Sequence, residues 1–185
     1  MTDNARGGDA VSDGELVERG RSGDDDALDE LVRRHHASAY RVARSITRLD
    51  DAAQDVVQDA FIKAFRALSG FRGDASFRTW LMTITANEAR LALRKRSRWN
   101  ESAIDDVGPI AVDDPDPAEQ AVNGQESSRA RALLETLPEK QRLSVSLRVD
   151  EGLSFREIAD MIGSTEGAAR VNYFHGIRRL RELMV

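Results

Sequence analysis

The sequence has no cysteine, few aromatic residues and no long apolar run. The absence of cysteine among 185 residues excludes disulfides, thiolate metal sites and thiol nucleophiles. With only 5% aromatic residues, any core must consist mainly of Leu, Val, Ile and Ala. No stretch approaches the roughly 18 apolar residues that a membrane span requires, and residues 1–10 are too polar for a signal segment. These absences predict a cytoplasmic protein without membrane insertion.

The usual signatures of catalysis and of metal binding are missing as well. The sequence contains no phosphate-binding loop, no HExxH motif and no Ser-His-Asp arrangement. His35 and His36 are adjacent, so on a helix they point about 100° apart and cannot easily chelate one ion. We therefore expect no enzymatic activity, no catalytic residue, no cofactor and no metal site.

Charge is abundant but unevenly distributed. A net charge of −5 argues against strong DNA binding by the chain alone, because neutralising phosphates normally requires a basic surplus. Residues 90–98 carry five basic and no acidic side chains, whereas residues 101–119 carry seven acidic and no basic ones. Such segregation predicts separate surfaces for separate partners.

Hydrophobic periodicity predicts an all-α fold of two small helical domains. Apolar residues recur at helical spacing in segments that begin near Asp24, Asp50 or Asp51, and Ser76, and a short amphipathic helix over 13–21 precedes them. An acidic, proline-containing stretch follows, which predicts a flexible linker: either a solvated spacer or a mimic of nucleic acid inside a partner channel. The expected organisation is a disordered N-terminus (1–11), a first domain (12–98), the linker (99–125) and a second domain (126–185).

Residues 154–181 have the layout of a helix-turn-helix. Ser154 and Glu157 form a capping box, Gly163 ends the first helix and Thr165 caps the second. The helical spacing of the last helix predicts an inward face made of Ala169, Tyr173, Gly176 or Ile177, Leu180 and Met184. It predicts an outward face made of Arg170, Val171, Phe174 and Arg178. An outward Phe beside Arg favours contact with the major groove of DNA; the alternative is that Phe174 packs on the preceding helices.

Two features of the first domain also leave two interpretations open. Asp55, Asp59 and Ile62 share one helix face with Gln58, which suits either plain solvation or docking on a basic coiled coil. The segment around residues 71–80 interleaves aromatic and basic residues, as single-stranded nucleic acid recognition does, and Asn87 could line a base pocket. Alternatively, Phe77 and Trp80 belong to the core.

Two strings resemble the extracytoplasmic-function family of RNA polymerase sigma factors. They are DDAAQDVVQDAFIKAFRALSGFRGDASFRTWLMTITANEA and LPEKQRLSVSLRVDEGLSFREIADMIGSTEGAARVNYFHGIRRLREL. The resemblance implies sigma region 2 before the linker and region 4 after it. It implies a protein that binds core RNA polymerase, recognises the −35 and −10 promoter elements and assists promoter melting in response to stress or envelope signals.

The resemblance also implies partners and site residues. The partners are the β′ clamp helices and β flap of the polymerase core, promoter DNA and an anti-sigma factor, with a monomeric free chain. The residues implied for polymerase binding are Asp55, Gln58, Asp59 and Ile62. Those implied for the −10 element are Arg72, Asp74, Ser76, Phe77, Asn87 and Arg90. Those implied for the −35 element are Arg170, Val171, Asn172, Phe174, His175 and Arg178.

The last helix departs from the family pattern. Where family members often read VRSRIFRAR, this chain reads ARVNYFHGIR, so a promoter sequence cannot be transferred from relatives. A stand-alone helix-turn-helix regulator that acts without polymerase is the main alternative, and a helical adaptor that binds only protein is a more distant one.

Overall fold

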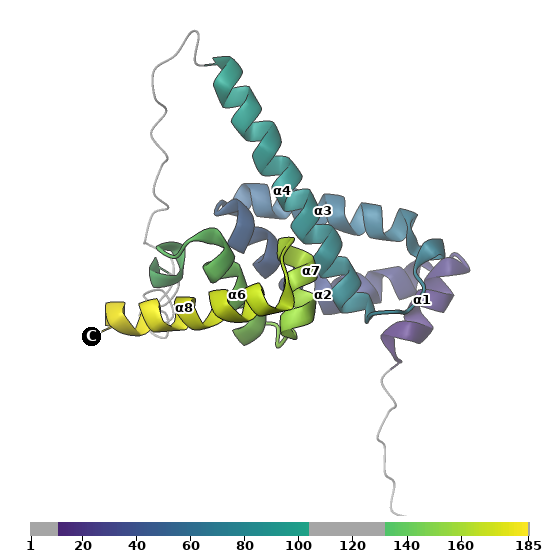
Figure 1. The fold of residues 1–185 in the computed structure, drawn as a ribbon. Coiled ribbons are helices and arrows are strands. Elements are labelled where there is room, and N and C mark those ends of the chain that lie inside the picture. Colours follow the sequence, from purple (N-terminus) through teal and green to yellow (C-terminus); the bar gives the residue numbers. More distant parts are fainter. Residues whose placement is uncertain (1–10, 104–131, 185) are drawn as a thin grey trace, which may run out of the picture.

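The computed structural model describes residues 11–103 and 132–184, which form two groups of helices (Figure 1). The first group contains α1 (Asp13–Arg21), α2 (Asp25–Thr47), α3 (Asp50–Arg66), the 3-10 helix η1 (Leu68–Gly70) and α4 (Phe77–Ala103). The second contains a helical turn at 132–135, α6 (Glu139–Val149), α7 (Phe155–Ile162) and α8 (Glu166–Met184). No strand occurs among the described residues, so the all-α prediction is confirmed.

Side-chain caps explain where most of these helices begin. Ser12 and Glu15 form a capping box at α1, and the Asp24 carboxylate accepts the backbone N–H of Ala27 at α2. The predicted capping box of Ser154 and Glu157 is present at α7. Gly163 ends α7 with a φ of 60°, in the left-handed region that glycine adopts without strain.

The sequence pattern predicts that Asp50 or Asp51 caps the start of α3, and this prediction is wrong. Leu49 occupies the cap position and makes no side-chain hydrogen bond there. Asp50 lies in the first turn, where its carboxylate accepts the Tyr40 hydroxyl (2.8 Å) and the Arg44 Nε–H (2.7 Å). The Asp50 carboxylate therefore makes a tertiary contact with α2 instead of capping the start of α3.

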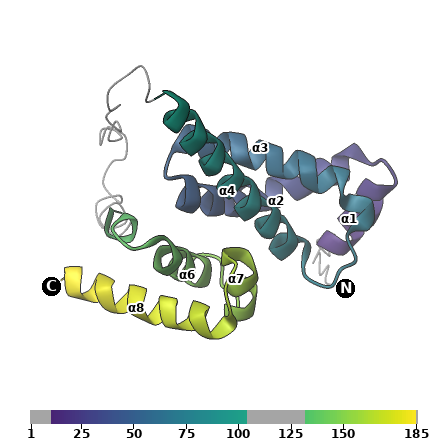
Figure 2. The same cartoon turned by 45° about the horizontal axis from the view of Figure 1, so that its top comes forward.

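Helix α4 extends beyond the boundary that the sequence predicted for the linker. It continues to Ala103, past Trp99, because no Gly or Pro interrupts the chain before Gly108. Its C-terminal half projects from the other helices in both views (Figures 1 and 2). Residues 1–10 of the predicted N-terminus, residues 104–125 of the linker and residues 126–131 of the predicted second domain lie outside the described residues.

Both groups of helices contribute to one continuous core. In the first group, the buried stripe of α2 packs against α3 and against Leu81 and Met82 of α4. In the second, Leu143, Ile158 and Ala169 bring α6, α7 and α8 together. The inward face predicted for α8 holds at Ala169 and Gly176, but Met184 is 64% exposed because it lies at the free end of the helix.

The two groups pack directly on each other, α2 against α6 and α4 against α7 (Figure 2). Arg142 of α6 is buried and donates to the carbonyl oxygens of Ser45 (2.9 Å) and Leu137 (3.3 Å). Burial lowers the pKa of this guanidinium, yet arginine stays charged. The Ser45 carbonyl belongs to the last turn of α2, whose partial negative charge favours a cation. The structure thus describes a closed arrangement that no local pattern predicted.

Candidate functional site

The predicted polymerase-binding residues form one exposed face on α3. Asp55, Gln58 and Asp59 are exposed, and Ile62 is 42% exposed, which is unusual for a large apolar side chain. The opposite face of α3 carries Val56, Val57 and Ala60 into the core. An ion pair between Lys63 and Glu88 (2.5 Å) ties the same helix to α4. The structure therefore places all four predicted residues together on a rigid element.

A groove beside this face escaped the sequence analysis. It has a volume of about 350 Å³ and lies between α2 and α3. Its lining residues are Val32, His36, Gln54, Val57, Gln58, Phe61, Ile62 and Phe65. The Phe61 and Phe65 rings, whose centroids lie 5.8 Å apart, are both part of this lining. The helical spacing of α3 places Phe61 and Phe65 on one face of the helix, but the groove exists only because α2 packs beside that face.

The loop between η1 and α4 presents three of the predicted −10 residues. Arg72, Asp74 and Ser76 are exposed, and Arg72 pairs with Asp74 at 2.9 Å. Gly73 between them has a φ of 77°, a conformation that few other residues adopt. Arg21 of α1 donates to the carbonyl oxygens of Leu68 and Phe71, which anchors the start of the loop.

The aromatic residues of this segment support the loop from beneath. Phe77 is only 2% exposed, so the structure places it in the core rather than on the surface. Its ring contacts Phe71, Trp80 and the buried His35 at centroid distances of 6.1, 5.9 and 5.4 Å. Phe71 and Trp80 are half-buried, so they are the rings with accessible edges here. Interleaving of aromatic and basic residues could not reveal which ring faces solvent.

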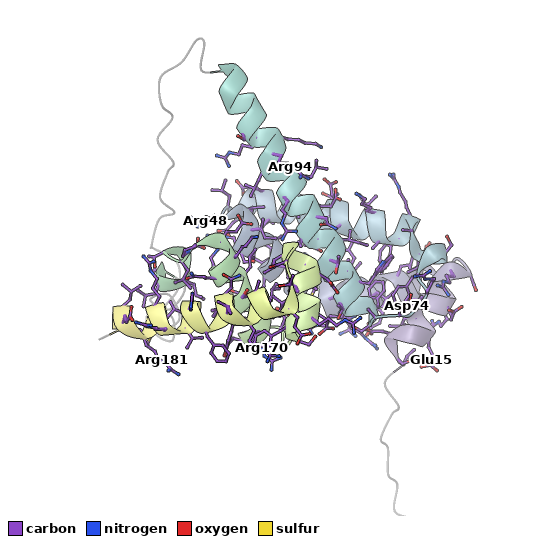
Figure 3. All side chains as sticks on the ribbon, in the orientation of Figure 1. Glu15, Arg48, Asp74, Arg94, Arg170 and Arg181 are labelled. Carbon is purple, nitrogen blue, oxygen red and sulfur yellow. The ribbon has the colours of Figure 1, made fainter. Side chains whose placement is uncertain are left out.

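Asn87 and Arg90 lie on α4, away from the loop. Asn87 is exposed and stands about 17 Å along the helix from Ser76, given the rise per residue. Arg90 is half-buried, and burial lowers its pKa while Glu139 of α6 opposes that shift. Arg94 continues the basic segment along the projecting half of α4 (Figure 3). The predicted −10 residues therefore extend from the loop along one helix, with Phe77 beneath them.

The outward face predicted for α8 is exposed. Val171 is 52% and Phe174 58% exposed, and Arg170 and Arg178 are exposed beside them. Arg170 pairs with Glu166 (3.1 Å) and its guanidinium lies 5.3 Å from the centre of the Phe155 ring. Arg178 pairs with Glu182 at 3.0 Å.

The remaining two α8 residues lie differently. His175 is exposed, whereas Asn172 is half-buried and so lies partly on the inner face. Tyr173, predicted as core, is half-buried and contacts the rings of Phe155 and Phe174 at 5.5 and 5.3 Å. An exposed apolar and basic stripe on the second helix of a helix-turn-helix is the arrangement that major-groove binding uses.

Contacts between the two groups of helices involve residues that the sequence analysis did not single out. Glu151, in the turn between α6 and α7, has a side chain that is only 1% exposed. It accepts the Arg41 Nε–H (2.5 Å) and an N–H of Arg78 from the first group. Nothing in the local pattern around an acidic turn residue indicates a buried pair with helices so distant in sequence.

The described residues also bear on metal binding and on membrane insertion. Among residues 11–103 and 132–184, no group of three or more His, Cys, Asp or Glu side chains could hold a metal ion. In those same ranges, no helix is both long enough and apolar enough to cross a membrane.

Comparisons with known proteins assign both halves of the chain. Residues 31–98 match the family model of sigma-70 region 2, and residues 127–180 match that of sigma-70 region 4. The chain is 35% identical to the ECF RNA polymerase sigma factor SigM of Mycobacterium tuberculosis, over 94% of this chain and 85% of that protein. It is 37% identical to the ECF RNA polymerase sigma-E factor of Escherichia coli, over 89% of this chain and 90% of that protein.

Solved structures agree with this assignment. The sigma factor RpoE from Bartonella quintana, in complex with the anti-sigma factor NepR, matches with a TM-score of 0.69 and 25% identity, over 84% of this chain and 95% of that one. CnrH in complex with the cytosolic domain of CnrY matches with a TM-score of 0.66 and 26% identity, over 93% of this chain and 96% of that one. Similarity that spans both groups of helices does not favour a stand-alone helix-turn-helix regulator. The chain therefore belongs to the extracytoplasmic-function group of RNA polymerase sigma factors and consists of regions 2 and 4.

Proposed function

We propose that each function of this sigma factor belongs to one of the three exposed surfaces. The α3 face with Asp55, Gln58, Asp59 and Ile62 docks on the β′ clamp helices of the polymerase core. The loop at 72–76 and the outer side of α4 bind the −10 element, and the outer stripe of α8 reads the −35 element. The observation that carries the proposal is the exposure of Ile62, Val171 and Phe174, large apolar side chains that stand beside charged residues.

Promoter melting then needs no bond chemistry from the chain. Unstacking a base costs a few kcal/mol, and stacking on a protein ring returns about 1–3 kcal/mol per base. The exposed amide of Asn87 and the half-buried rings of Phe71 and Trp80 supply contacts to a melted strand. The buried Phe77 supports those rings, so we assign it a positioning role rather than direct contact with a base.

We further propose an anti-sigma factor as a partner. Support comes from the solved relative RpoE, which is bound to the anti-sigma factor NepR. The apolar groove between α2 and α3 lies beside the α3 face, so a protein segment seated there would cover the surface that docks on the polymerase. Region 4 would contact the β flap of the polymerase when the anti-sigma factor is absent.

Reconstitution with core RNA polymerase tests the proposal. Because the promoter is unknown, transcription on fragmented genomic DNA of the source organism, followed by sequencing of RNA 5′ ends, identifies start sites without prior assumptions. The double change Asp59→Asn and Ile62→Ala should weaken core binding at least about tenfold, the cost of one or two interface contacts. Phe174→Ala should retain core binding and lose start-site selection, because it alters only α8.

Asp160→Asn, which like Asp59→Asn removes one exposed acidic charge but lies on α7 outside the α3 face, is the matched control and should leave core binding unchanged. Failure of the unchanged protein to select any start site with core polymerase would refute the proposed function. Equal loss of core binding in the Ile62 and Phe174 variants would refute the division between α3 and α8.

A further inference from the structure

Glu151 joins region 4 to region 2 through two arginines. Its side chain is 1% exposed, and its two carboxylate oxygens accept from Arg41 of α2 and from Arg78 of α4. A second N–H of Arg78 donates to the backbone carbonyl of Glu151 at 2.8 Å, and Arg41 also donates to the Ser38 hydroxyl. A buried carboxylate is tolerable only with such partners, and here both arginines come from region 2.

Two guanidiniums around one carboxylate leave a surplus positive charge. Arg41 and Arg78 remain 44% and 32% exposed while they hold Glu151, so both reach the surface of region 2. If region 4 moved away, the guanidinium groups of Arg41 and Arg78 would lie close together without an anion between them. Paired guanidiniums of this kind bind phosphate through several parallel N–H groups, as they bind a carboxylate.

The arginine pair lies beside the loop that we assign to the −10 element. Arg78 is in the first turn of α4, directly after the loop and Phe77. At the same place, the Ser76 hydroxyl donates to Thr79, and the Thr79 hydroxyl donates to Glu157 of α7 at 2.9 Å. Region 4 therefore covers the first turn of α4, next to the position that a melted strand would occupy.

Promoter geometry requires this contact to open. The −35 and −10 elements are separated by about 25 base pairs, or roughly 85 Å of duplex at 3.4 Å per base pair. In the closed arrangement, α7 touches α4, so α8 and the loop cannot lie on both elements at once. Separation of the regions removes Glu151 from the arginine pair at the moment when promoter DNA arrives.

We infer that Arg41 and Arg78 form a binding site for a backbone phosphate of the melted promoter strand, and that Glu151 occupies this site in the free protein. Glu151 and the strand compete for the same two guanidiniums, so the closed form binds the −10 strand poorly. The inference rests on the proposed function, because it takes the loop and α4 to be the −10 surface.

The test needs neither polymerase nor a known promoter. The probe is a fluorescent (dT)₁₂ oligonucleotide, measured by anisotropy at low salt, against the unchanged chain, Glu151→Gln, and Glu151→Gln combined with Arg41→Gln. Glu151→Gln should bind about tenfold more tightly, because it lifts a competing closed state. Arg41→Gln should remove that gain. A (dT)₁₂ with a neutral methylphosphonate backbone should show no gain.

Closure itself can be followed by energy transfer between dyes. The chain lacks cysteine, so Ser69→Cys in region 2 and Arg179→Cys in region 4, both at exposed positions, accept dyes without background labelling. Transfer should fall in Glu151→Gln and stay unchanged in Asp160→Asn, the matched control that removes one exposed acidic charge from region 4. Circular dichroism verifies folding, and Glu151→Asp, which keeps the charge but shortens its reach, should open the chain partially.

Equal (dT)₁₂ affinity in Glu151→Gln and Asp160→Asn would overturn the inference, because net charge alone would then explain the gain. A gain that survives Arg41→Gln would overturn it too. These outcomes are independent of whether the chain selects start sites with core polymerase, so failure here and failure of the proposed function remain distinguishable.

Discussion

Gly176 lies where α8 packs closely on α6. A Cβ atom at this position would lie 2.7 Å from Val145 Cγ2 and 3.3 Å from the Gln141 carbonyl oxygen. Real Cβ atoms essentially never come within 3.0 Å of another atom, and the nearby Gln141 oxygen belongs to the backbone and cannot rotate aside. The absence of a side chain at Gly176 therefore allows α8, the helix that carries Phe174, to pack tightly on α6 within region 4.

Gly176→Ala should destabilise the protein by about 1–3 kcal/mol, the usual cost of overpacking a core. Gly167→Ala is the matched control on the same helix, where a Cβ would meet nothing within 4 Å. The control should leave stability unchanged or raise it by up to about 1 kcal/mol, since alanine favours helix more than glycine. Urea unfolding followed by circular dichroism measures both, and shifts of the same sign would contradict the argument.

At the scale of the element, α7 combines a local cap with an inter-region contact. Glu157 accepts from the Ser154 backbone N–H and hydroxyl, and it also accepts the Thr79 hydroxyl of α4. Burial raises the pKa of Glu157, but these hydrogen bonds outweigh burial and leave the pKa below its ordinary value. The charged carboxylate is therefore the form that supports both the start of α7 and its contact with region 2.

The lowered pKa predicts acid sensitivity at this helix. Stability from Glu157 is complete above its ordinary pKa of about 4.3 and is lost as the pH falls through the lowered value. Glu157→Gln retains a capping side chain but cannot titrate. When the pH is lowered from 7 to 3, the melting temperature of the variant should decrease by a few degrees less than that of the unchanged chain. Thermal melting at each pH measures this difference. Parallel pH profiles would count against this role for Glu157.

At the scale of the whole molecule, the net charge and the closed arrangement both disfavour promoter binding by the free chain. The chain has a net charge of −5, although residues 90–98 and the outer side of α8 are basic. In the closed arrangement, Glu151 neutralises part of the basic surface of region 2, and the two surfaces that we propose for the −10 and −35 elements are held too close to reach both elements. The free chain is therefore poorly suited to bind a promoter.

A gel-shift experiment can check this expectation. On a promoter fragment identified by the start-site sequencing, the isolated chain at 150 mM salt should show no specific shift, whereas chain plus core polymerase should give a stable complex. Lowering the salt should strengthen non-specific binding of the free chain, since phosphate contacts depend steeply on ionic strength. Tight, sequence-specific binding by the isolated chain at 150 mM salt would contradict the expectation.

Local patterns predicted most of the helices. The expected helix over 13–21 coincides with α1, and the caps at Ser12, Asp24 and Ser154 depend on residues three positions apart. The exposed stripe of α8 also followed from spacing alone. Such features lie within one or two turns, where sequence separation and spatial separation are nearly the same. The function itself followed from resemblance, which the comparisons with relatives then confirmed.

Only the tertiary structure decided the roles of residues whose partners are far away in sequence. Asp50 serves α2 rather than its own helix end, Phe77 lies beneath the loop, and Glu151 pairs with Arg41 and Arg78. In each case the stabilising energy comes from burial or from an ion pair between separate helices. Helical periodicity contains no information about which helices meet. The sequence by itself determined the elements and their exposed faces, while packing determined which of those faces are covered in the free protein.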